Sequence, residues 1–326
     1  MALNASILGC EGLSVTDWEK AFFRDSDPFG FILFARNIDT PDQLRQLTAD
    51  LREAVGRDAP ILIDQEGGRV QRMRAPHWRE WLPPLDQMEQ ASDPIRAMWL
   101  RNRIIADELR AVGIDANCAP CADIVGPDTH PFLRNRCYGI DLETVIAASV
   151  AAADGLLDGG VLPVLKHIPG HGRATVDSHK GLPHVTATHD VLTGSDFSAF
   201  AALQDLPMGM TAHIVFDEID PANPATMSKD MNAIIRDQIG FKGLLMTDDI
   251  SMGALSGSVG DRTKAAIAAG CDVVLHCNGN QDEMVSVVAL AGTLAEDRAE
   301  AALSPRKTPT SVDIAALNEE LNTLLG

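Results

Sequence analysis

The chain has 326 residues, of which 45% are hydrophobic, and it carries a formal net charge of −19 at pH 7. This length suits two ordinary domains or one large α/β barrel. The acidic excess argues against a nucleic acid or an anionic membrane surface as partner, because most of the protein surface would repel either one, and it leaves a neutral or small polar ligand as the expectation.

The N-terminus contains Ile7-Leu8-Gly9-Cys10, which loosely resembles a lipoprotein cleavage site. A lipoprotein signal needs a basic start and a longer apolar core, and the first six residues supply neither. Cys10 is therefore expected to be buried at a first strand. No later apolar run reaches membrane-spanning length without a charge, since Asp154 and Asp158 interrupt the best candidate. A soluble, cytoplasmic protein is expected.

Short apolar runs of β character alternate with longer segments of helical periodicity, which is typical of repeated βα units. Eight runs are predicted to be strands: Ser6–Cys10, Gly30–Ala35, Pro60–Asp64, Asp115–Pro120, Val161–His167, Gly209–Val215, Gly243–Thr247 and Cys271–Cys277. Helices are predicted at Thr40–Val55, Pro94–Val112, Leu142–Leu157, Asp196–Leu203, Asp230–Ile239, Arg262–Ala269, Glu283–Leu303 and Ile314–Leu325.

This alternation predicts one (β/α)8 TIM-type barrel spanning residues 1–326, with a final amphipathic helix at about 314–325 packed on its outside. No linker rich in proline, glycine or serine divides the chain. An open, doubly wound sheet is the alternative, but no Gly-x-Gly-x-x-Gly turn follows the first strand.

The six cysteines are scattered and do not form the pattern of a disulfide scaffold. Cys118-Ala-Pro-Cys121 has redox spacing, yet no second Cys-x-x-Cys accompanies it. Cysteines that pack in a reducing cytoplasm are the better interpretation.

In a barrel of this kind, catalytic groups lie at the carboxyl ends of the strands. Polar side chains mark those ends here: Asp64, Lys166, His167, His213 and Asp248. Four predicted strands therefore direct polar groups toward one mouth.

The block that follows the third strand combines Asp64 and Glu66 with two glycines and ends at Arg72. The glycines allow a sharp turn close to a ligand, and a carboxylate beside an arginine can bind adjacent sugar hydroxyls. A turn held by a local arginine–carboxylate pair is the alternative interpretation.

Two adjacent carboxylates, Asp248 and Asp249, close the seventh strand. Neighbouring residues of an extended chain point to opposite sides, so one of them is expected to face the mouth while the other braces the loop.

The segment Lys166–Gly181 concentrates histidines, lysines and glycines. His167 and His171 would form a metal pair only on a helix, and Pro169 with its neighbouring glycines excludes a helix, so no metal is expected. Asp177 and His179 have the spacing of an extended pair, in which a carboxylate fixes and tunes an imidazole for proton transfer. An Asx-type turn with an exposed histidine is the alternative.

Several blocks between about residue 6 and about residue 300 carry a family resemblance. They are Asp64-Gln65-Glu66-Gly67-Gly68-Arg69-Val70, Lys166–Gly172 followed by Asp177-Ser178-His179, and Thr247–Met252, with support from Gly30–Asn37, Met210–Phe216 and Pro224–Ser228. Together they resemble glycoside hydrolase family 3, and more narrowly its NagZ-type β-N-acetylglucosaminidase branch. The histidine block joined to Asp-Ser-His is highly specific to that branch.

The resemblance implies that Asp248 is the nucleophile and that His179, oriented by Asp177, is the general acid/base. It implies a set of sugar-binding residues: Asp64, Arg72, Arg136, Lys166 and His167. Family members usually read Arg-Ser-Phe-Gly around the second arginine, whereas this chain reads Arg136-Cys137-Tyr138-Gly139. The arginine matches and its two neighbours differ. Many members carry a second domain after the barrel, and a single-domain enzyme is expected here.

The implied reaction is retaining exo-hydrolysis that removes a terminal, non-reducing β-linked N-acetylglucosamine through a covalent glycosyl-aspartate. The implied substrates are N-acetylglucosaminyl-anhydromuramyl sugars and their peptides, produced by peptidoglycan turnover and recycled in the cytoplasm. A monomer without metal or organic cofactor is expected.

Three other functions remain open. A phosphorylase on the same scaffold is possible because an imidazole repels phosphate less than a carboxylate does. A metal-dependent barrel hydrolase is a distant alternative. A non-catalytic sugar-binding protein would use Asp64 and Lys166, but it would not need Asp248 together with the pair of Asp177 and His179.

Overall fold

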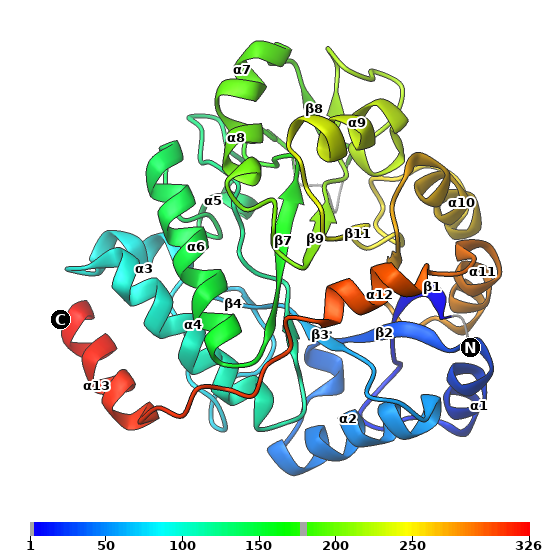
Figure 1. Ribbon diagram of the computed structural model, residues 1–326, viewed down its shortest axis with the longest axis horizontal. Helices are drawn as coiled ribbons and strands as arrows, with labels where there is room; N and C mark the ends of the chain where they lie inside the picture. Colours follow the sequence, from blue (N-terminus) through cyan, green and yellow to red (C-terminus); the bar gives the residue numbers. More distant parts are fainter. Residues whose placement is uncertain (1–2, 177–180) are drawn as a thin grey trace.

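Eight parallel strands follow one another in sequence order around a barrel in the computed structural model, which describes residues 3–176 and 181–326 (Figure 1). They are β1 (Asn4–Gly9), β2 (Pro28–Leu33), β3 (Ile61–Ile63), β6 (Ala116–Asn117), β7 (Leu162–Ile168), β9 (Met208–Thr211), β11 (Leu244–Met246) and β12 (Val274–His276). Seven neighbouring pairs are joined in parallel register, and the last gap, between β11 and β12, is closed by a bridge from Met246 to Val273. The predicted (β/α)8 barrel is therefore confirmed, and each strand overlaps its predicted range.

Helices cover the outside of the barrel (Figure 1). The longer ones are α1 (Asp17–Ser26), α2 (Pro41–Val55), α3 (Pro84–Gln90), α4 (Pro94–Arg110), α6 (Leu142–Asp158), α10 (Val259–Ala269), α11 (Gln281–Ala291), α12 (Glu296–Leu303) and α13 (Ile314–Leu325). The shorter ones are α5 (Pro131–Arg134), α7 (His189–Gly194), α8 (Asp196–Ala201) and α9 (Lys229–Ala233). In the part of the chain that is described, no helix combines the length and the apolar character needed to cross a membrane.

Two predicted helices differ from the structure. The single helix expected at Glu283–Leu303 is wrong, because the chain turns at Gly292, where φ is 73°, and separates α11 from α12. The helix expected at Asp230–Ile239 is α9 continued by a π-helical turn at Ile234–Gln238. Among the described residues, four helices are absent from the prediction: α1, α3, α5 and α7. The last three have seven residues or fewer and so show little periodicity, whereas α1 has ten residues and a capping box at its N-terminus that could have revealed it.

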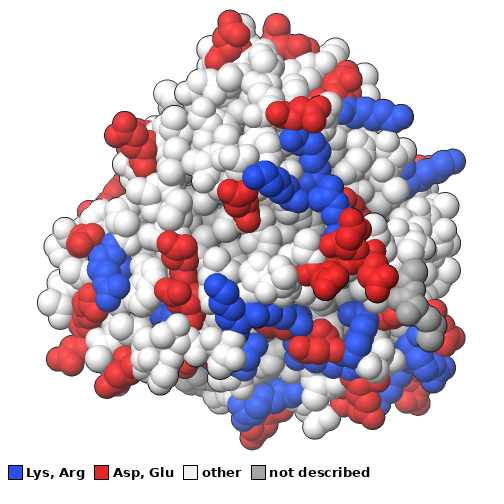
Figure 2. Space-filling model, viewed as in Figure 1, with Lys and Arg blue, Asp and Glu red and all other residues white. Residues whose placement is uncertain are grey.

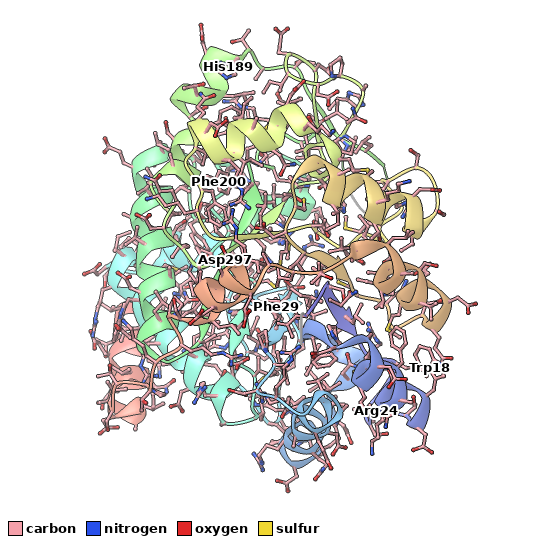
Figure 3. The ribbon with its side chains drawn as sticks, turned by 45° about the vertical axis from the view of Figure 1, so that its right-hand side comes forward. Trp18, Arg24, Phe29, His189, Phe200 and Asp297 are labelled. Atoms are coloured by element: carbon pink, nitrogen blue, oxygen red, sulfur yellow. The ribbon has the colours of Figure 1, made fainter. Side chains whose placement is uncertain are left out.

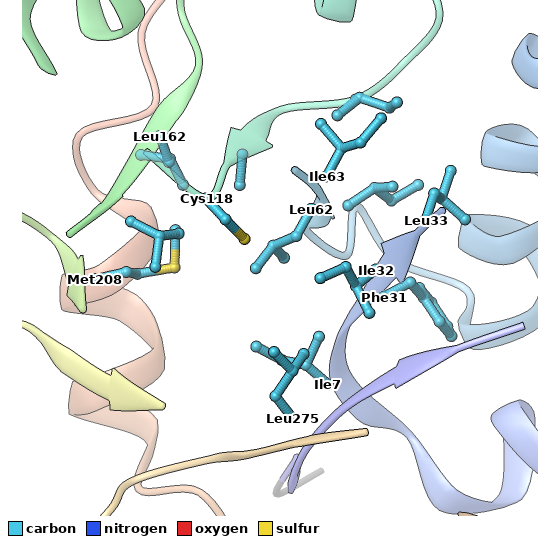
Figure 4. Close-up of a cluster of buried hydrophobic side chains, with 14 of the residues drawn as sticks. Ile7, Phe31, Ile32, Leu33, Leu62, Ile63, Cys118, Leu162, Met208 and Leu275 are labelled. Atoms are coloured by element: carbon cyan, nitrogen blue, oxygen red, sulfur yellow. The ribbon is translucent and has the colours of Figure 1, made fainter. Parts of the chain in front are cut away.

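The barrel interior is apolar. Ile7, Leu62, Leu275 and Met208 converge there from four strands together with the thiol of Cys118 (Figure 4). Each side chain of this size contributes about 1.5–3 kcal/mol when it is fully buried. All six cysteines are free and buried, which confirms their prediction as packing residues.

Phenylalanines join this interior to the surrounding helices. Phe29 on β2 and Phe200 on α8 are both fully buried, whereas Trp18 and Arg24 lie on α1 at the edge of the molecule (Figure 3). The aromatic rings thus fill the layer between strands and helices.

Residues 304–313 cross the end of the barrel at which the strands begin, and we call them the C-terminal strap. Arg306 forms an ion pair of 2.7 Å with Asp115, just before β6, and another of 3.1 Å with Asp58, just before β3. Arg52 pairs with the same two carboxylates. Acidic and basic side chains are interspersed on the face shown in Figure 2, which the strap crosses.

Beyond the strap, α13 packs against α4, where Arg96 binds Glu320 through two nitrogens at 2.7 and 2.9 Å. Leu321 is fully buried in this contact. The final helix therefore lies at its predicted position on the outside of the barrel.

Candidate active site

A short hairpin of β4 (Gln65–Gly67) and β5 (Val70–Gln71) follows β3 and places Asp64 and Arg72 side by side. The Gln65 side chain accepts hydrogen bonds from the backbone N–H of Arg72 and Met73 and so fixes the end of the hairpin. Arg72 Nη2 then donates to Asp64 Oδ2 at 2.9 Å. The local arginine–carboxylate pair is present, and it faces a cavity.

The turn of this hairpin requires glycine. Gly67 has φ of 109°, and a Cβ there would lie 1.8 Å from the buried guanidinium of Arg101. Gly68 also has positive φ, at 57°. The double glycine therefore lets a tight turn pass over a buried arginine.

Lys166, near the end of β7, is the centre of the site's charge network. Its Nζ lies 2.8 Å from Asp64 Oδ1 and 2.5 Å from Glu66 Oε1, and its side chain is buried. Burial would lower the pKa of Lys166, but the carboxylates of Asp64 and Glu66 outweigh it and raise that pKa. Burial would likewise raise the pKa of Asp64, yet Lys166 and Arg72 hold it well below its usual range. Lys166 and Asp64 therefore both stay charged at neutral pH.

Arg136 lies two residues beyond α5 and forms a bidentate ion pair with Glu66. Its Nε donates to Oε2 at 2.9 Å, and its Nη2 donates to Oε1 at 2.8 Å. Burial would raise the pKa of Glu66, but Arg136 and Lys166 lower it to about 2. Arg136 Nη2 also lies 3.3 Å from His167 Nε2. Glu66 therefore fixes two cations that the cavity presents to a ligand.

Asp123, after β6, orients His167 from the other side. Its Oδ2 lies 2.7 Å from His167 Nδ1 and accepts from the Cys121 thiol at 3.2 Å, while Oδ1 accepts from the backbone of His171 at 2.6 Å. Burial would raise the pKa of Asp123, but His167 lowers it to about 2. With Nδ1 of His167 against this carboxylate, its Nε2 is directed toward Arg136 Nη2.

Cys121, Asp123 and His167 bring three atoms of the kind that bind metals within 4.8 Å of one another in the described part of the chain. The Cys121 thiol and the His167 ring already form hydrogen-bond contacts with Asp123. The Arg136 guanidinium beside His167 adds a positive charge that would repel a metal cation. A hydrogen bond with Cys137, together with burial, raises the pKa of the Cys121 thiol well above its usual value. The set therefore fits a hydrogen-bonded group better than a cation site.

Asp248 follows β11 and is partly buried. Its Oδ1 accepts from the backbone N–H of Asp249 at 2.8 Å. Burial would raise its pKa, but His213 and His167 outweigh this and lower it. Asp249 accepts hydrogen bonds from Ser251 and from the backbone N–H of Cys277, so it braces the loop as predicted, but it also lines the same cavity as Asp248, which the prediction excluded.

One cavity of about 210 Å³ collects these groups. Its lining includes six of the predicted site residues: Asp64, Arg72, Arg136, Lys166, His167 and Asp248. Its volume is below the ~300–1,000 Å³ of typical drug-sized sites, so it suits a ligand of about one sugar ring. Asp177 and His179, the predicted acid/base pair, lie outside the described residues.

Glu66 and Asp123, two charged partners of the predicted residues, were not predicted as site residues themselves. Glu66 lies inside the block that contains Asp64, and Asp123 lies in the loop after β6, farther from its strand than Asp64 is from β3. A search for carboxylates in the whole loop after every strand would have found Asp123. Nothing local marks Glu66, because its partners are 70 and 100 residues away in the sequence.

Comparisons with known proteins agree with this geometry. The model of the glycosyl hydrolase family 3 N terminal domain matches residues 15–305. A beta-hexosaminidase of Chromobacterium violaceum is 37% identical over 292 residues, covering 86% of this chain and 80% of that protein. One of Alkalilimnicola ehrlichii is 35% identical over 286 residues, covering 85% and 82%. A crystal structure of NagZ from Neisseria gonorrhoeae in complex with N-trifluoroacetyl-D-glucosamine has a TM-score of 0.88 at 28% identity, covering 100% of this chain and 99% of that one.

Proposed function

The chain belongs to glycoside hydrolase family 3 and is a glycosidase of the β-hexosaminidase type, and on that basis we propose that it is a retaining exo-β-N-acetylglucosaminidase. The observation that carries the proposal is that Asp248 lines the same small cavity as the charge network of Asp64, Lys166 and Arg136. We assign Asp248 as the nucleophile and the charge network as the groups that bind sugar hydroxyls, since all of them line this one cavity.

The charge network binds the sugar. Asp64 accepts hydrogen bonds from hydroxyl groups, while Lys166, Arg72 and Arg136 donate to hydroxyl oxygens. Because these groups are held by one another, they lose little freedom when the sugar enters. The ring is thus oriented with its anomeric carbon toward Asp248.

Asp248 attacks that carbon. The lowered pKa keeps its carboxylate ionised at neutral pH, as a nucleophile requires. His179 protonates the departing oxygen, and a glycosyl ester forms on Asp248. His179 then takes a proton from water, the water opens the ester, and the sugar leaves with its original configuration. Asp177 orients and tunes the imidazole. The roles of His179 and Asp177 are proposed from the sequence motif.

The size of the cavity favours action at the end of a chain, because one ring fills it and the leaving group stays outside. We assign N-acetylglucosaminyl-anhydromuramyl sugars and their peptides as substrates, in a cytoplasmic pathway that recycles peptidoglycan. We propose that the reaction needs no metal or organic cofactor and that the enzyme acts as a monomer.

An activity panel tests the function. Nitrophenyl β-N-acetylglucosaminide should be cleaved far faster than the corresponding glucoside and xyloside. A 2- or 5-fluoro glycosyl inhibitor should add one sugar mass to a peptide that contains Asp248. Labelling of Asp249 or Glu66 would show that the wrong carboxylate was assigned, and sugar 1-phosphate formed in the presence of phosphate would identify a phosphorylase.

A further inference from the structure

His213 lies in the short segment between β9 and β10 (Val215–Phe216). Its side chain is fully buried and is not among the residues that line the cavity. The sequence predicts it among the polar side chains that mark the strand ends, yet the proposed reaction gives it no role. Because a buried imidazole has lost its contacts with water, the groups that it contacts in the protein indicate what it does.

The two ring nitrogens of His213 contact two different segments. Nε2 lies 3.0 Å from the carbonyl oxygen of Asp249, and because that oxygen can only accept a hydrogen bond, Nε2 carries a proton. Nδ1 lies 2.8 Å from Thr226 Oγ1. That hydroxyl also lies 2.9 Å from Thr211 Oγ1 and 3.0 Å from the Ala212 carbonyl oxygen. The ring is therefore held from behind by contacts that reach back to the end of β9.

The contact with Asp249 fixes the backbone next to the proposed nucleophile. The N–H of Asp249 donates to Asp248 Oδ1 at 2.8 Å, so the orientation of the Asp248 carboxylate depends on that of the residue after it. On one side of this loop, the N–H of Ile250 donates to the Leu275 carbonyl of β12 at 2.9 Å. On the other side, His213 fixes the loop to the end of β9. Asp249 is thus held between the two strands that flank β11.

The imidazole also affects the charge state of the Asp248 carboxylate. Burial would raise the pKa of Asp248, and His213 is the neighbour that lowers it most. Burial also lowers the pKa of His213 itself, so its ring is neutral at pH 7 and gains a positive charge only on acidification. Other titratable groups around these two side chains are Lys166 and His167 of β7, Asp249 of the same loop, and the thiols of Cys118 and Cys277.

We propose that His213 is a positioning residue for the nucleophile, which holds the Asp249 carbonyl and thereby directs the Asp248 carboxylate toward the anomeric carbon. This inference rests on the proposed function, because it assigns a role behind the carboxylate that the proposed reaction uses. A reacting group that is displaced by about 1 Å can lose about a hundredfold in rate, even though the substrate still binds. The loss of His213 should therefore impair the reaction and leave sugar binding intact.

Two substitutions of similar shape separate the two contacts of the ring. The amide nitrogen of His213→Gln can replace Nε2 and donate to the Asp249 carbonyl, whereas that of His213→Asn reaches only the place of Nδ1. On nitrophenyl β-N-acetylglucosaminide, His213→Asn should lower kcat/KM roughly ten- to a hundredfold, and His213→Gln should recover most of this loss. The inhibition constant of N-acetylglucosamine should stay close to the wild-type value in both variants, because the groups that bind the ring are unchanged.

The pH dependence of kcat/KM is a readout that a purely structural role would not change. An amide cannot become cationic beside Asp248, so the pKa of that carboxyl should rise in both variants. The acid limb of the profile should therefore move to higher pH. The basic limb should stay in place, since it reports the group that protonates the departing oxygen.

His276→Gln is the control, since His276 is an equally buried histidine on β12 that contacts Glu283 and does not line the cavity. It should change neither kcat/KM nor the acid limb. Wild-type kcat/KM with an unmoved acid limb in His213→Asn overturns the inference while the glycosidase assignment stands, and so does an equal loss of kcat/KM and of affinity for N-acetylglucosamine. If His213→Asn does not fold, the acid limb of His213→Gln decides. Failure of the wild-type enzyme to cleave the substrate rejects the proposed function, and the role of His213 with it.

Discussion

Replacing Glu66 by glutamine should destabilise the protein strongly, even though Glu66 does not line the cavity. In the folded protein its side chain is 2% exposed and binds both Lys166 and Arg136. The substitution keeps the shape and removes the charge. Lys166 then retains Asp64, but Arg136 loses its carboxylate partner while it stays buried.

The expected magnitude follows from that loss. Removing one partner of a buried ion pair typically costs about 3–5 kcal/mol, because the remaining charge is left without compensation. Asp64→Asn provides a comparison in the same network, since the Asp64 side chain is 16% exposed and water can solvate the cations it leaves. A hydrogen bond lost at such a site costs about 1–3 kcal/mol. Glu66→Gln should therefore lower the free energy of unfolding more than Asp64→Asn does.

Urea unfolding followed by tryptophan fluorescence measures both changes, and kcat/KM on a nitrophenyl substrate measures function. Asp64→Asn should lower kcat/KM strongly while it lowers the free energy of unfolding only moderately, because Asp64 faces the sugar. Arg136→Gln combined with Glu66→Gln should cost less than the sum of the two single changes, since the double variant leaves no unpaired guanidinium. A Glu66→Gln enzyme within about 0.5 kcal/mol of wild type, the usual range of surface substitutions, would refute the reasoning.

Three further results are expected. Burial and the neighbouring His167 lower the pKa of His171 from 6.5 to about 4, so between these pH values the unfolded chain binds a proton that the folded chain does not. Stability should fall on acidification by up to about 1.4 kcal/mol per pH unit, and an unaltered slope in His171→Asn would contradict this. Asp248→Ala should reduce turnover by several orders of magnitude with an unchanged circular dichroism spectrum, and appreciable remaining activity would exclude it as nucleophile. Exhaustive chelation should leave activity intact, whereas a loss that zinc restores would revive the metal-dependent alternative.

The sequence predicts the barrel well because its signals are local. Each strand is a short apolar run, and each carboxyl end can be located from the residue that closes it, as Asp64 and Asp248 do. Prediction failed for short helices with little periodicity, such as α3, α5 and α7, and where one glycine decided the outcome, as Gly292 does between α11 and α12.

The candidate site divides in the same way. Lys166 and His167 could be predicted from their place at the end of a strand. Glu66 and Asp123 act through partners 70 and 44 residues away in the sequence, and only the folded barrel brings those partners together. Long-range pairing of this kind leaves no periodicity that a single sequence can reveal.

The C-terminal strap has a consequence for the order in which the protein matures. The eight strands leave the ribosome before residues 304–325 do. In a nascent barrel, Asp115 can therefore pair with Arg52, but Arg306 is not yet available as its second cation. Thr310 also pairs through its backbone with Asp158 and Arg103, which close the same end. The end of the barrel at which the strands begin is therefore covered by a segment that is synthesised after all eight strands, and the nascent chain should stay sensitive to proteases until the strap and α13 have emerged.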